Sequence, residues 1–379
     1  MIKANIENAL HDARNCIDPD RFCSMDLDNL KFGLDTFGDT QNDDSGAPIS
    51  AAATIRNVVE QAVLADQLGL DHFSIGEHHR DDFAVSSPDT VLAGIATRTK
   101  QITLGTGVTV LSSDDPVRVY QRFATIDALS NGRAEITAGR GSFIESFPLF
   151  GYELSDYGAL FEEKLELLVE ILKENAVNWS GTMRAPLINQ QIYPKTERGS
   201  IPLRVGVGGT PESVVRAARL NAKLAIAIIG GDPARFAPFA DLYRSSMNEF
   251  AHPIRPISIH SPGHIAASQE IAIEELWPHY QVMFGRIGRE RGWGQVTKEH
   301  FINEVKYGSF YVGTPEQVAR KIAYAMKSIG AERFDFKYSN GPMAHSKLMN
   351  SIELYATKVV PMVKEILSAD RAASIATSR

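Results

Sequence analysis

Eight short apolar segments, most of them followed by a helical pattern, constrain the fold of this chain more than any other feature. They are Phe32–Phe37, His72–Gly76, Ile102–Val110, Ala134–Ala138, Leu203–Val207, Leu224–Ile229, Ile254–His260 and Phe334–Tyr338. Their near-continuous apolar character is typical of parallel strands that are covered on both faces. Strands alternating with helices predict either a closed barrel or a doubly wound sheet, and eight strands favour an α/β (β/α)₈ TIM barrel.

The helical segments carry start and stop signals at their ends. Apolar residues recur at helical spacing over 51–69, and Gly69 ends that pattern. Asp115 and Pro116 open another helix with an acidic cap and a proline in its first turn. Asn131-Gly132 provides a left-handed end for the same helix. The alternation therefore rests on local signals as well as on apolar patterning.

Three regions are expected along the chain. Residues 1–30 are polar and weakly helical, which predicts an N-terminal extension packed on the domain or on a partner subunit. The barrel should occupy residues 31–367, and residues 368–379 should form a flexible tail. Two connections, about 141–200 after the fourth strand and 263–312 after the seventh, are too long for turns. Both leave the end of the barrel at which such enzymes build their active sites.

Composition excludes several classes of partner. The 39 basic residues are outnumbered by 46 acidic ones, so no basic field attracts nucleic acid or anionic lipid. No apolar run approaches the roughly 20 residues that a membrane-spanning helix needs. Two cysteines, Cys16 and Cys23, are too few for a disulfide framework and lack a second pair of zinc ligands. We therefore expect a cytoplasmic protein that binds neither nucleic acid nor membrane.

Glu77, His78 and His79 directly follow the second strand, where titratable groups are well placed for catalysis. An imidazole exchanges protons near neutral pH, which makes His78 a candidate catalytic residue. Two alternatives remain open. The histidines are surface residues bonded to a loop, or they join His260 and His264 in a metal site. The prediction from the sequence is that no metal is bound.

Three glycine-rich stretches lie at other strand ends. Gly105 and Gly107 sit inside the third strand, which indicates either a flat ring against the backbone or a tight barrel position. Arg140 stands between two glycines after the fourth strand and suits a phosphate, a carboxylate or an ordinary surface ion pair. Residues 206–213 run from the fifth strand into a helix start that favours an anion, or simply form a capped glycine turn.

These stretches together resemble the luciferase-like monooxygenase family, over about residues 31–365. The resemblance rests on Gly76-Glu77-His78-His79, on Gly105-Thr106-Gly107 through Asp115-Pro116-Val117-Arg118, on Asp127-Ala128-Leu129-Ser130-Asn131-Gly132-Arg133 through Gly139-Arg140-Gly141, and on Gly209-Thr210-Pro211-Glu212-Ser213 and Val312-Gly313-Thr314-Pro315-Glu316. The Glu-His-His sequence is most similar to that of the bacterial luciferase subunit that carries the active site.

The resemblance implies a barrel that holds flavin mononucleotide (FMN) at the carboxyl ends of its strands; some relatives use the deazaflavin F420 instead. It assigns catalysis to His78 with Glu77 and implies a non-proline cis peptide at Gly107-Val108. The cofactor-binding residues that it implies are Gly107, Val108, Arg140, Gly208, Gly209, Thr210 and Ser213. One departure concerns Gly139, because luciferase carries a cysteine beside the matching arginine. That difference speaks against light emission as the native activity.

The expected function is a monooxygenase that uses reduced FMN and O₂ to oxidise a small organic substrate. The alternatives are an F420-dependent dehydrogenase, a non-catalytic flavin-binding protein and a metal-dependent hydrolase. We expect a homo-oligomer, supplied with reduced flavin by a separate reductase. Residues 268–308 combine glycines with aromatic residues, including Trp277, Tyr280, Phe284 and Trp293, and are expected to form a lid over the flavin.

Overall fold

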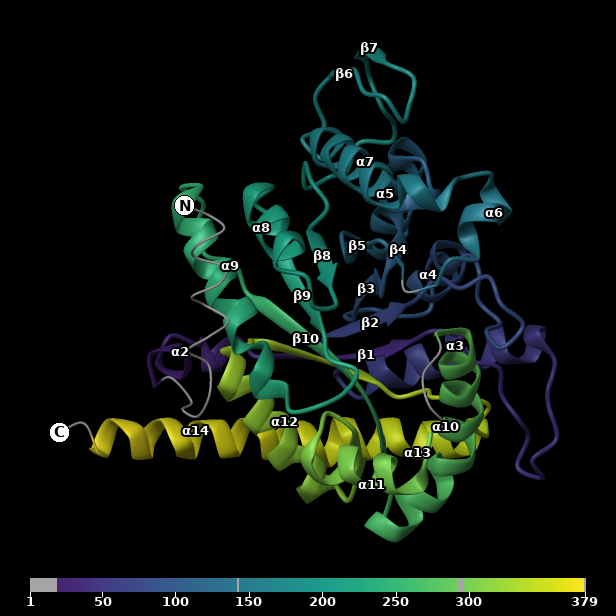
Figure 1. Cartoon of the computed structure of the whole chain (residues 1–379), viewed down its shortest axis with the longest axis vertical. Helices are drawn as coiled ribbons and strands as arrows, with labels where there is room; N and C mark the ends of the chain where they lie inside the picture. The colour runs from purple at the N-terminus through teal and green to yellow at the C-terminus, as the bar shows by residue number, and fades with distance from the viewer. Residues whose placement is uncertain (1–18, 142, 292–295, 378–379) are drawn as a thin grey trace.

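A computed structural model describes residues 19–377, apart from residue 142 and residues 292–295. Its parallel strands close into a barrel surrounded by helices (Figure 1), which confirms the predicted fold. The barrel strands are β1 (Lys31–Thr36), β2 (His72–Ile75), β3 (Thr103–Thr106) with its continuation β4 (Thr109–Val110), β5 (Ala134–Gly139), β8 (Leu203–Val207), β9 (Lys223–Ala227), β10 (Ile257–Ile265) and β12 (Arg333–Lys337). The barrel closes because β12 pairs with both β1 and β10.

The helices that cover the barrel begin and end where the local signals predict. Ser50 caps its helix by accepting a hydrogen bond from the Ala53 amide, and Asp115 does the same at the start of α5. Asn131 ends α5 in the left-handed region with φ of 55°. The covering helices are α3 (Ala51–Gln67), α4 (Pro88–Ala96), α5 (Pro116–Ser130), α7 (Tyr157–Ile171), α8 (Pro211–Arg219), α9 (Ala237–Glu249), α12 (Pro315–Ile329), α13 (His345–Leu354) and α14 (Val360–Thr377).

The sequence predicts strands that are apolar almost throughout. This prediction is wrong for β12, in which charged and apolar residues alternate. Phe336 points outward, where its ring stacks on Tyr355 at 4.9 Å. Arg333 points inward and reaches Glu135 on the far side of the barrel. Successive side chains of a strand face opposite sides. The barrel interior is therefore lined by polar groups, and the apolar core lies between the strands and the helices.

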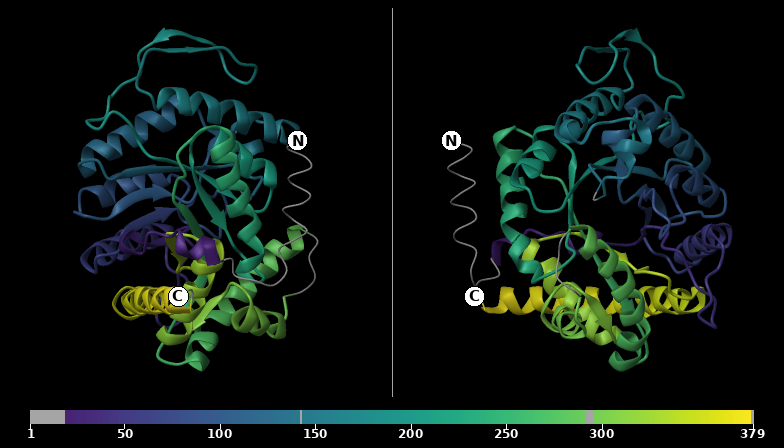
Figure 2. Two further views of the ribbon diagram at one scale, coloured as in Figure 1. Left: turned by 90° about the vertical axis from the view of Figure 1, so that its left-hand side faces the viewer. Right: turned by 45° about the vertical axis from the view of Figure 1, so that its right-hand side comes forward.

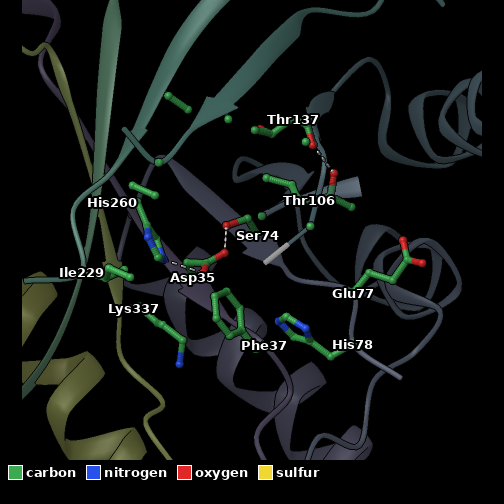
Figure 3. Close-up of a pocket in the computed structure, with 18 of the residues that line it drawn as sticks. Asp35, Phe37, Ser74, Glu77, His78, Thr106, Thr137, Ile229, His260 and Lys337 are labelled. Atoms are coloured by element: carbon green, nitrogen blue, oxygen red, sulfur yellow. Dashed lines mark hydrogen bonds and ion pairs between the residues drawn. The ribbon is translucent and has the colours of Figure 1, made fainter. Parts of the chain in front are cut away.

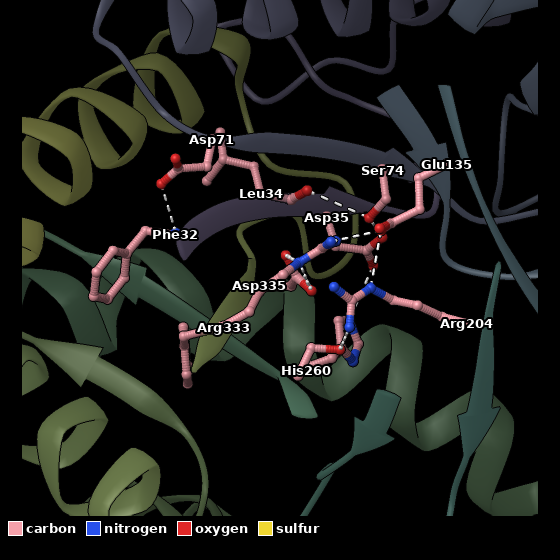
Figure 4. Close-up of polar contacts among 12 residues, drawn as sticks. Phe32, Leu34, Asp35, Asp71, Ser74, Glu135, Arg204, His260, Arg333 and Asp335 are labelled. Carbon is pink, nitrogen blue, oxygen red and sulfur yellow. Dashed lines mark hydrogen bonds and ion pairs between the residues drawn. The ribbon is translucent and has the colours of Figure 1, made fainter. Parts of the chain in front are cut away.

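An ionic network fills the barrel interior below the strand mouths (Figure 4). Glu135 Oε1 accepts hydrogen bonds from Arg204 Nε at 3.0 Å and from Arg333 Nη1 at 2.6 Å. Arg333 Nε also donates to Asp335 at 2.8 Å. Burial alone would raise the pKa of Glu135, but the two guanidinium groups outweigh it and hold that pKa well below its usual range. The network joins β5, β8 and β12 across the barrel.

The two long connections form separate structures outside the barrel. After β5 come α6 (Ser146–Phe150), the 3₁₀ turn η3 (Leu154–Asp156), α7 and the hairpin of β6 (Val177–Trp179) and β7 (Leu187–Gln190). This hairpin projects beyond α7 in all views (Figure 2). After β10 come α10 (Gln269–Arg291), α11 (Lys298–Tyr307) and β11 (Tyr311–Gly313), which extends the sheet beside β10.

The segment expected to be a lid is helical, and most of its aromatic rings contact one another. Trp277 lies 5.4 Å from Phe301, and Tyr280 stacks on Phe284 at 4.1 Å between ring centroids. Met283 and Phe284 also line the central pocket. Trp293 lies outside the described residues. The segment is thus built around its own apolar cluster, and closure over a ligand stays a prediction.

Both ends of the described chain pack beside each other. The short helix α2 (Pro19–Cys23) and the turn η1 (Leu27–Asn29) lie against α12 and α14, and Phe22 is buried there. Helix α14 continues to Thr377, so residues 368–377 are helical where the sequence predicts a flexible tail. Cys16 lies outside the described residues, and Cys23 is an exposed free thiol. The remaining turns are η2 (Leu111–Ser113), η4 (Pro233–Phe236) and the π-helical η5 (Tyr355–Val359).

In the described part of the chain, none of the helices combines the length and the hydropathy of a membrane-spanning segment.

Replacing Glu135 by Gln should destabilise the fold by about 3–5 kcal/mol, because two buried arginines would lose their shared counter-charge. Urea unfolding at pH 7 measures this loss, with Glu353→Gln on the exposed side of α13 as the control. The stabilising contribution of Glu135 should also start to decline as the pH falls below its unfolded-state pKa of about 4.3, and it should vanish only below the lower folded-state pKa. Equal unfolding midpoints for the two variants would contradict the importance of the network.

Candidate functional site

A pocket of about 630 Å³ opens at the carboxyl ends of the barrel strands. Side chains and backbone from every barrel strand line it, and helix α10 covers part of it with Met283 and Phe284. The residues labelled in Figure 3 come from β1, β2, β3, β5, β10 and β12 or from the loops that follow strands. The position agrees with the end at which barrel enzymes build their sites.

A buried carboxylate forms the floor of the pocket. Asp35, on β1, is 1% exposed and accepts a hydrogen bond from Ser74 on β2 through Oδ1. Its Oδ2 lies 2.9 Å from Nε2 of His260 on β10 (Figure 3). Strands β1 and β10 are not neighbours in the barrel, since β12 lies between them. The contact therefore crosses the interior of the barrel.

The peptide bond between Gly107 and Val108 is cis, as the resemblance implied. Both residues line the pocket. A Cβ on Gly107 would lie 2.2 Å from Asp35 Oδ1, so the missing side chain leaves room for that carboxylate. The packing of the protein itself therefore supports the interpretation of Gly107 as a tight barrel position.

Val108 occupies a space that two other glycines leave free. A Cβ on Gly139 would lie 2.6 Å from the Val108 side chain, and one on Gly206 would lie 2.9 Å from it. Gly139 is the position at which luciferase carries a cysteine. In this chain a larger residue there would displace Val108 from the wall of the pocket.

His78 lies where the sequence predicts, in the wall of the pocket, but its surroundings are aromatic. Its ring centroid is 4.4 Å from that of Phe83, 4.6 Å from Phe37 and 4.9 Å from Phe143. Burial, with smaller contributions from Lys337, Arg80 and His79, lowers the pKa of His78 to about 3. These surroundings favour a neutral imidazole at physiological pH, and the catalytic role of His78 stays a prediction.

Glu77 does not orient His78. Its Oε1 lies 2.9 Å from Nε2 of His79, and its Oε2 accepts a hydrogen bond from the Val110 amide at 3.2 Å. In Figure 3 the Glu77 side chain points away from the His78 ring. Glu77 therefore fixes the loop after β2 against β4, and His79 is the histidine that it holds.

The residues predicted to bind phosphate lie together at another part of the mouth. Arg140 Nη2 donates to the Thr210 hydroxyl at 3.4 Å, and that hydroxyl lies 2.7 Å from the hydroxyl of Ser213. Arg216 Nη1 donates to Ser213 at 3.4 Å, while its buried Nε has no hydrogen-bond partner among the described residues. Two guanidinium groups and two hydroxyls thus meet at the start of α8, where backbone N–H groups favour an anion.

Two glycines keep this cluster open. A Cβ on Gly208 or on Gly209 would meet no heavy atom within 4 Å, and Gly208 lines the pocket. Gly209 has φ of 136°, a conformation that side chains rarely allow. In the cluster formed by Arg140, Thr210, Ser213 and Arg216, hereafter the anion cluster, Arg140 lines the pocket directly.

A lysine also faces the pocket from β12. Lys337 Nζ lies 3.3 Å from Asp39 Oδ2 and 4.4 Å from the centroid of the Phe37 ring. Asp39 in turn accepts a hydrogen bond from Ser339 at 2.6 Å. The ammonium group is therefore held by a carboxylate and an aromatic face, and it adds positive charge near His78.

Sequence reasoning missed Asp35, Ser74 and Lys337, and it considered His260 only as a metal ligand. A signal for Lys337 was present, because polar residues recur at every second position in Arg333-Phe334-Asp335-Phe336-Lys337. Within the described residues, no group of three or more His, Cys, Asp or Glu side chains is placed to hold a metal ion.

His78 is expected to stay uncharged down to about pH 4, which ¹⁵N-histidine NMR measures directly. His78→Gln identifies the resonance, and free imidazole in the same buffers provides the reference. Because the unfolded chain binds a proton between pH 6.5 and 3 that folded His78 does not, stability should fall as the pH drops through this window. The Gln variant should lose less stability between pH 7 and 5. Protonation of His78 above pH 5 would contradict its described environment.

Two curated relatives illustrate the range of similar proteins. The chain is 29% identical over 175 residues to N-acetyl-S-alkylcysteine monooxygenase of Bacillus subtilis (strain 168), covering 45% of this chain and 50% of that protein. It is 30% identical over 163 residues to F420-dependent glucose-6-phosphate dehydrogenase of Amycolatopsis mediterranei (strain U-32), covering 41% and 48%. The chain thus spans about half the length of these relatives in the matches.

Solved structures share the fold over nearly their whole length. Monooxygenase RslO1 from Streptomyces bottropensis superimposes with a TM-score of 0.74 at 22% identity, covering 88% of this chain and 99% of that one. The oxygenating constituent of 3,6-diketocamphane monooxygenase from Pseudomonas putida, solved with FMN, gives 0.71 at 18% identity, covering 88% and 98%. The model of the luciferase-like monooxygenases matches residues 31–333. With its barrel and the site at the strand mouths, the chain belongs to the luciferase-like monooxygenase family.

Proposed function

We propose that this oxidoreductase binds reduced FMN in the pocket and uses O₂ to oxidise a small organic substrate. The observation that carries the proposal is the anion cluster, which joins a pocket large enough for a ring system and a substrate. A phosphate at Arg140 and Arg216 would receive charge-assisted hydrogen bonds. The Nε of Arg216 supplies a donor that none of the described residues uses. The FMN present in one similar structure supports the same choice of cofactor.

The residues that line the pocket have different proposed roles according to their position. Reduced FMN, when bound, supplies the two electrons with which O₂ is reduced. Val108, supported by the gaps at Gly139 and Gly206, forms a flat wall for a ring. Phe37, Phe83 and Phe143 keep water away from His78, whose neutral imidazole retains one N–H donor and one acceptor. We propose that His78 contacts the cofactor ring through hydrogen bonding and without carrying charge.

An F420-dependent dehydrogenase is the second candidate, favoured by the similarity to an enzyme of that kind. The two cofactors differ in their spectra and in their need for O₂. Purified protein that retains a chromophore absorbing near 450 nm, or that binds FMN in titration but not F420, would support the first proposal. We also propose that a separate reductase supplies reduced FMN. The turnover assay below therefore includes a reductase.

Arg140→Ala should weaken FMN binding roughly 10- to 100-fold, because one charge-assisted contact contributes about 1.5–3 kcal/mol. Quenching of FMN fluorescence on titration with protein gives the dissociation constant. Arg98→Ala, an exposed arginine after α4, is the matched control and should bind like the wild type. If both variants bind FMN equally well, Arg140 is not part of the phosphate site.

His78→Ala should lower turnover about 10- to 100-fold while FMN binding persists, as expected for the loss of one hydrogen bond in the transition state. A panel of substrates screened by oxygen consumption, with reduced FMN supplied by a reductase, provides the assay. The exposed His300→Ala variant should keep wild-type turnover. Near-normal turnover in His78→Ala, or complete loss of its FMN binding, would contradict this role.

A further inference from the structure

A second imidazole, that of His260, faces the pocket from the wall opposite His78, and the function proposed above assigns it no role. Its side chain is 17% exposed and lines the pocket, whereas Asp35 behind it is 1% exposed. Phe37 separates the two histidines, with ring centroids 4.6 Å from His78 and 6.1 Å from His260. The two imidazoles therefore share one cavity but have different neighbours.

The contact with Asp35 determines which nitrogen of His260 bears a hydrogen. An ionised carboxylate only accepts hydrogen bonds, so Nε2 must donate to Asp35 Oδ2 across 2.9 Å. The other carboxylate oxygen accepts from the Ser74 hydroxyl, which holds Asp35 in place. Nδ1 makes no hydrogen bond to a described residue. It is therefore the nitrogen that is free to exchange a proton with a molecule in the pocket.

We propose that His260 donates a proton during the reduction of O₂ at this site, with Asp35 as its positioning residue. The inference rests on the proposed use of reduced FMN. Without a substrate, anionic reduced FMN and O₂ would give oxidised FMN and hydrogen peroxide with uptake of one proton. The N–H bond at Nδ1 breaks, an O–H bond of the peroxide forms, and the electron pair of the broken bond stays on Nδ1. The resulting neutral imidazole is reprotonated from solvent.

Two carboxylates and one ammonium group lie near His260. Asp35 faces it from β1, and Asp335 lies opposite it in the register of β12. Lys337, also on β12, carries the positive charge, but Asp39 and the Ser339 carbonyl hold its ammonium group. The residues that reach the pocket from α10, Met283 and Phe284, carry no charge. An opposite charge within hydrogen-bond distance stabilises an imidazolium.

His78 lacks these conditions. The nearby carboxylate of Glu77 is engaged with His79 and Val110, and three aromatic rings surround the His78 imidazole. Asp35 and His260 instead form a pair in which a carboxylate orients an imidazole toward the ligand space. A purely structural role, tying β1 to β10 across the barrel, is the competing explanation, and the experiments below separate the two.

Histidine NMR of the flavin-free protein tests the geometry without any turnover. ¹⁵N-histidine labelling, with His260→Gln for assignment, should show His260 with its hydrogen on Nε2 at high pH. In Asp35→Asn this preference for Nε2 should weaken or reverse, because an amide can donate as well as accept a hydrogen bond. A hydrogen on Nδ1 at high pH in the wild type, or an unchanged tautomer in Asp35→Asn, would overturn the proposal.

Stopped-flow oxidation of bound reduced FMN by O₂, followed near 450 nm, tests the proton transfer without a substrate. His260→Gln should slow this oxidation about 100-fold, as loss of a general acid does, and change its dependence on pH. His252→Gln, outside the pocket, should match the wild type. Asp35→Asn should also change that pH dependence, because it removes the carboxylate that orients His260.

The outcomes distinguish the two proposals. If the wild type fails to bind FMN in the titration, the proposed function is wrong, and the NMR result alone then decides whether the pair has the inferred tautomer. If FMN binds but His260→Gln is oxidised within about twofold of the wild-type rate, the proton-donor role is wrong. A lower melting temperature in Asp35→Asn with an unchanged pH profile would show a structural tie and also overturn the role.

Discussion

The structure depends on the way its barrel interior compensates buried charge. Glu135 receives hydrogen bonds from Arg204 and Arg333, and Arg333 continues to Asp335. Isolated charges at such depth would be strongly unfavourable, so each member of this set requires the others. The network therefore fixes the strand register, because the inward charged side chains of β5, β8 and β12 find their partners in one register only. A slip of one residue in β12 would place Phe334 among the charges and Arg333 in the apolar layer.

The pocket floor extends the same polar interior toward the mouth. Asp335 contacts the network below and also lines the pocket, and Asp35 lies in the same part of the barrel. Room for Asp35 exists because residue 107 has no side chain. Gly107, Asp35 and the wall of the pocket thus form one packing arrangement. A ligand would rest on a surface that buried charge keeps rigid.

The sequence predicted the barrel from local strand and helix signals. The family resemblance implied that Arg140, Thr210 and Ser213 bind one ligand, and the three side chains do lie together. The contact between Glu77 and His79 was not predicted, since sequence order does not show which of two adjacent histidines turns toward the carboxylate. Asp35 and His260 are separated by 225 residues, so their contact depends on barrel closure, which no local pattern encodes. The helical course of residues 368–377 likewise depends on packing near α2 and α12.

Two histidines in one pocket show how environment decides the role of a residue type. Burial among three aromatic rings, with Lys337 and Arg80 adding positive charge, lowers the pKa of His78 to about 3 and leaves it neutral. His260 has the Asp35 carboxylate within hydrogen-bond distance, and its second nitrogen bonds to none of the described residues. A neutral imidazole suits hydrogen bonding to a ring, whereas a carboxylate-paired imidazole suits proton transfer. Because Phe37 lies between them, each histidine keeps its own electrostatic surroundings although both face the same pocket.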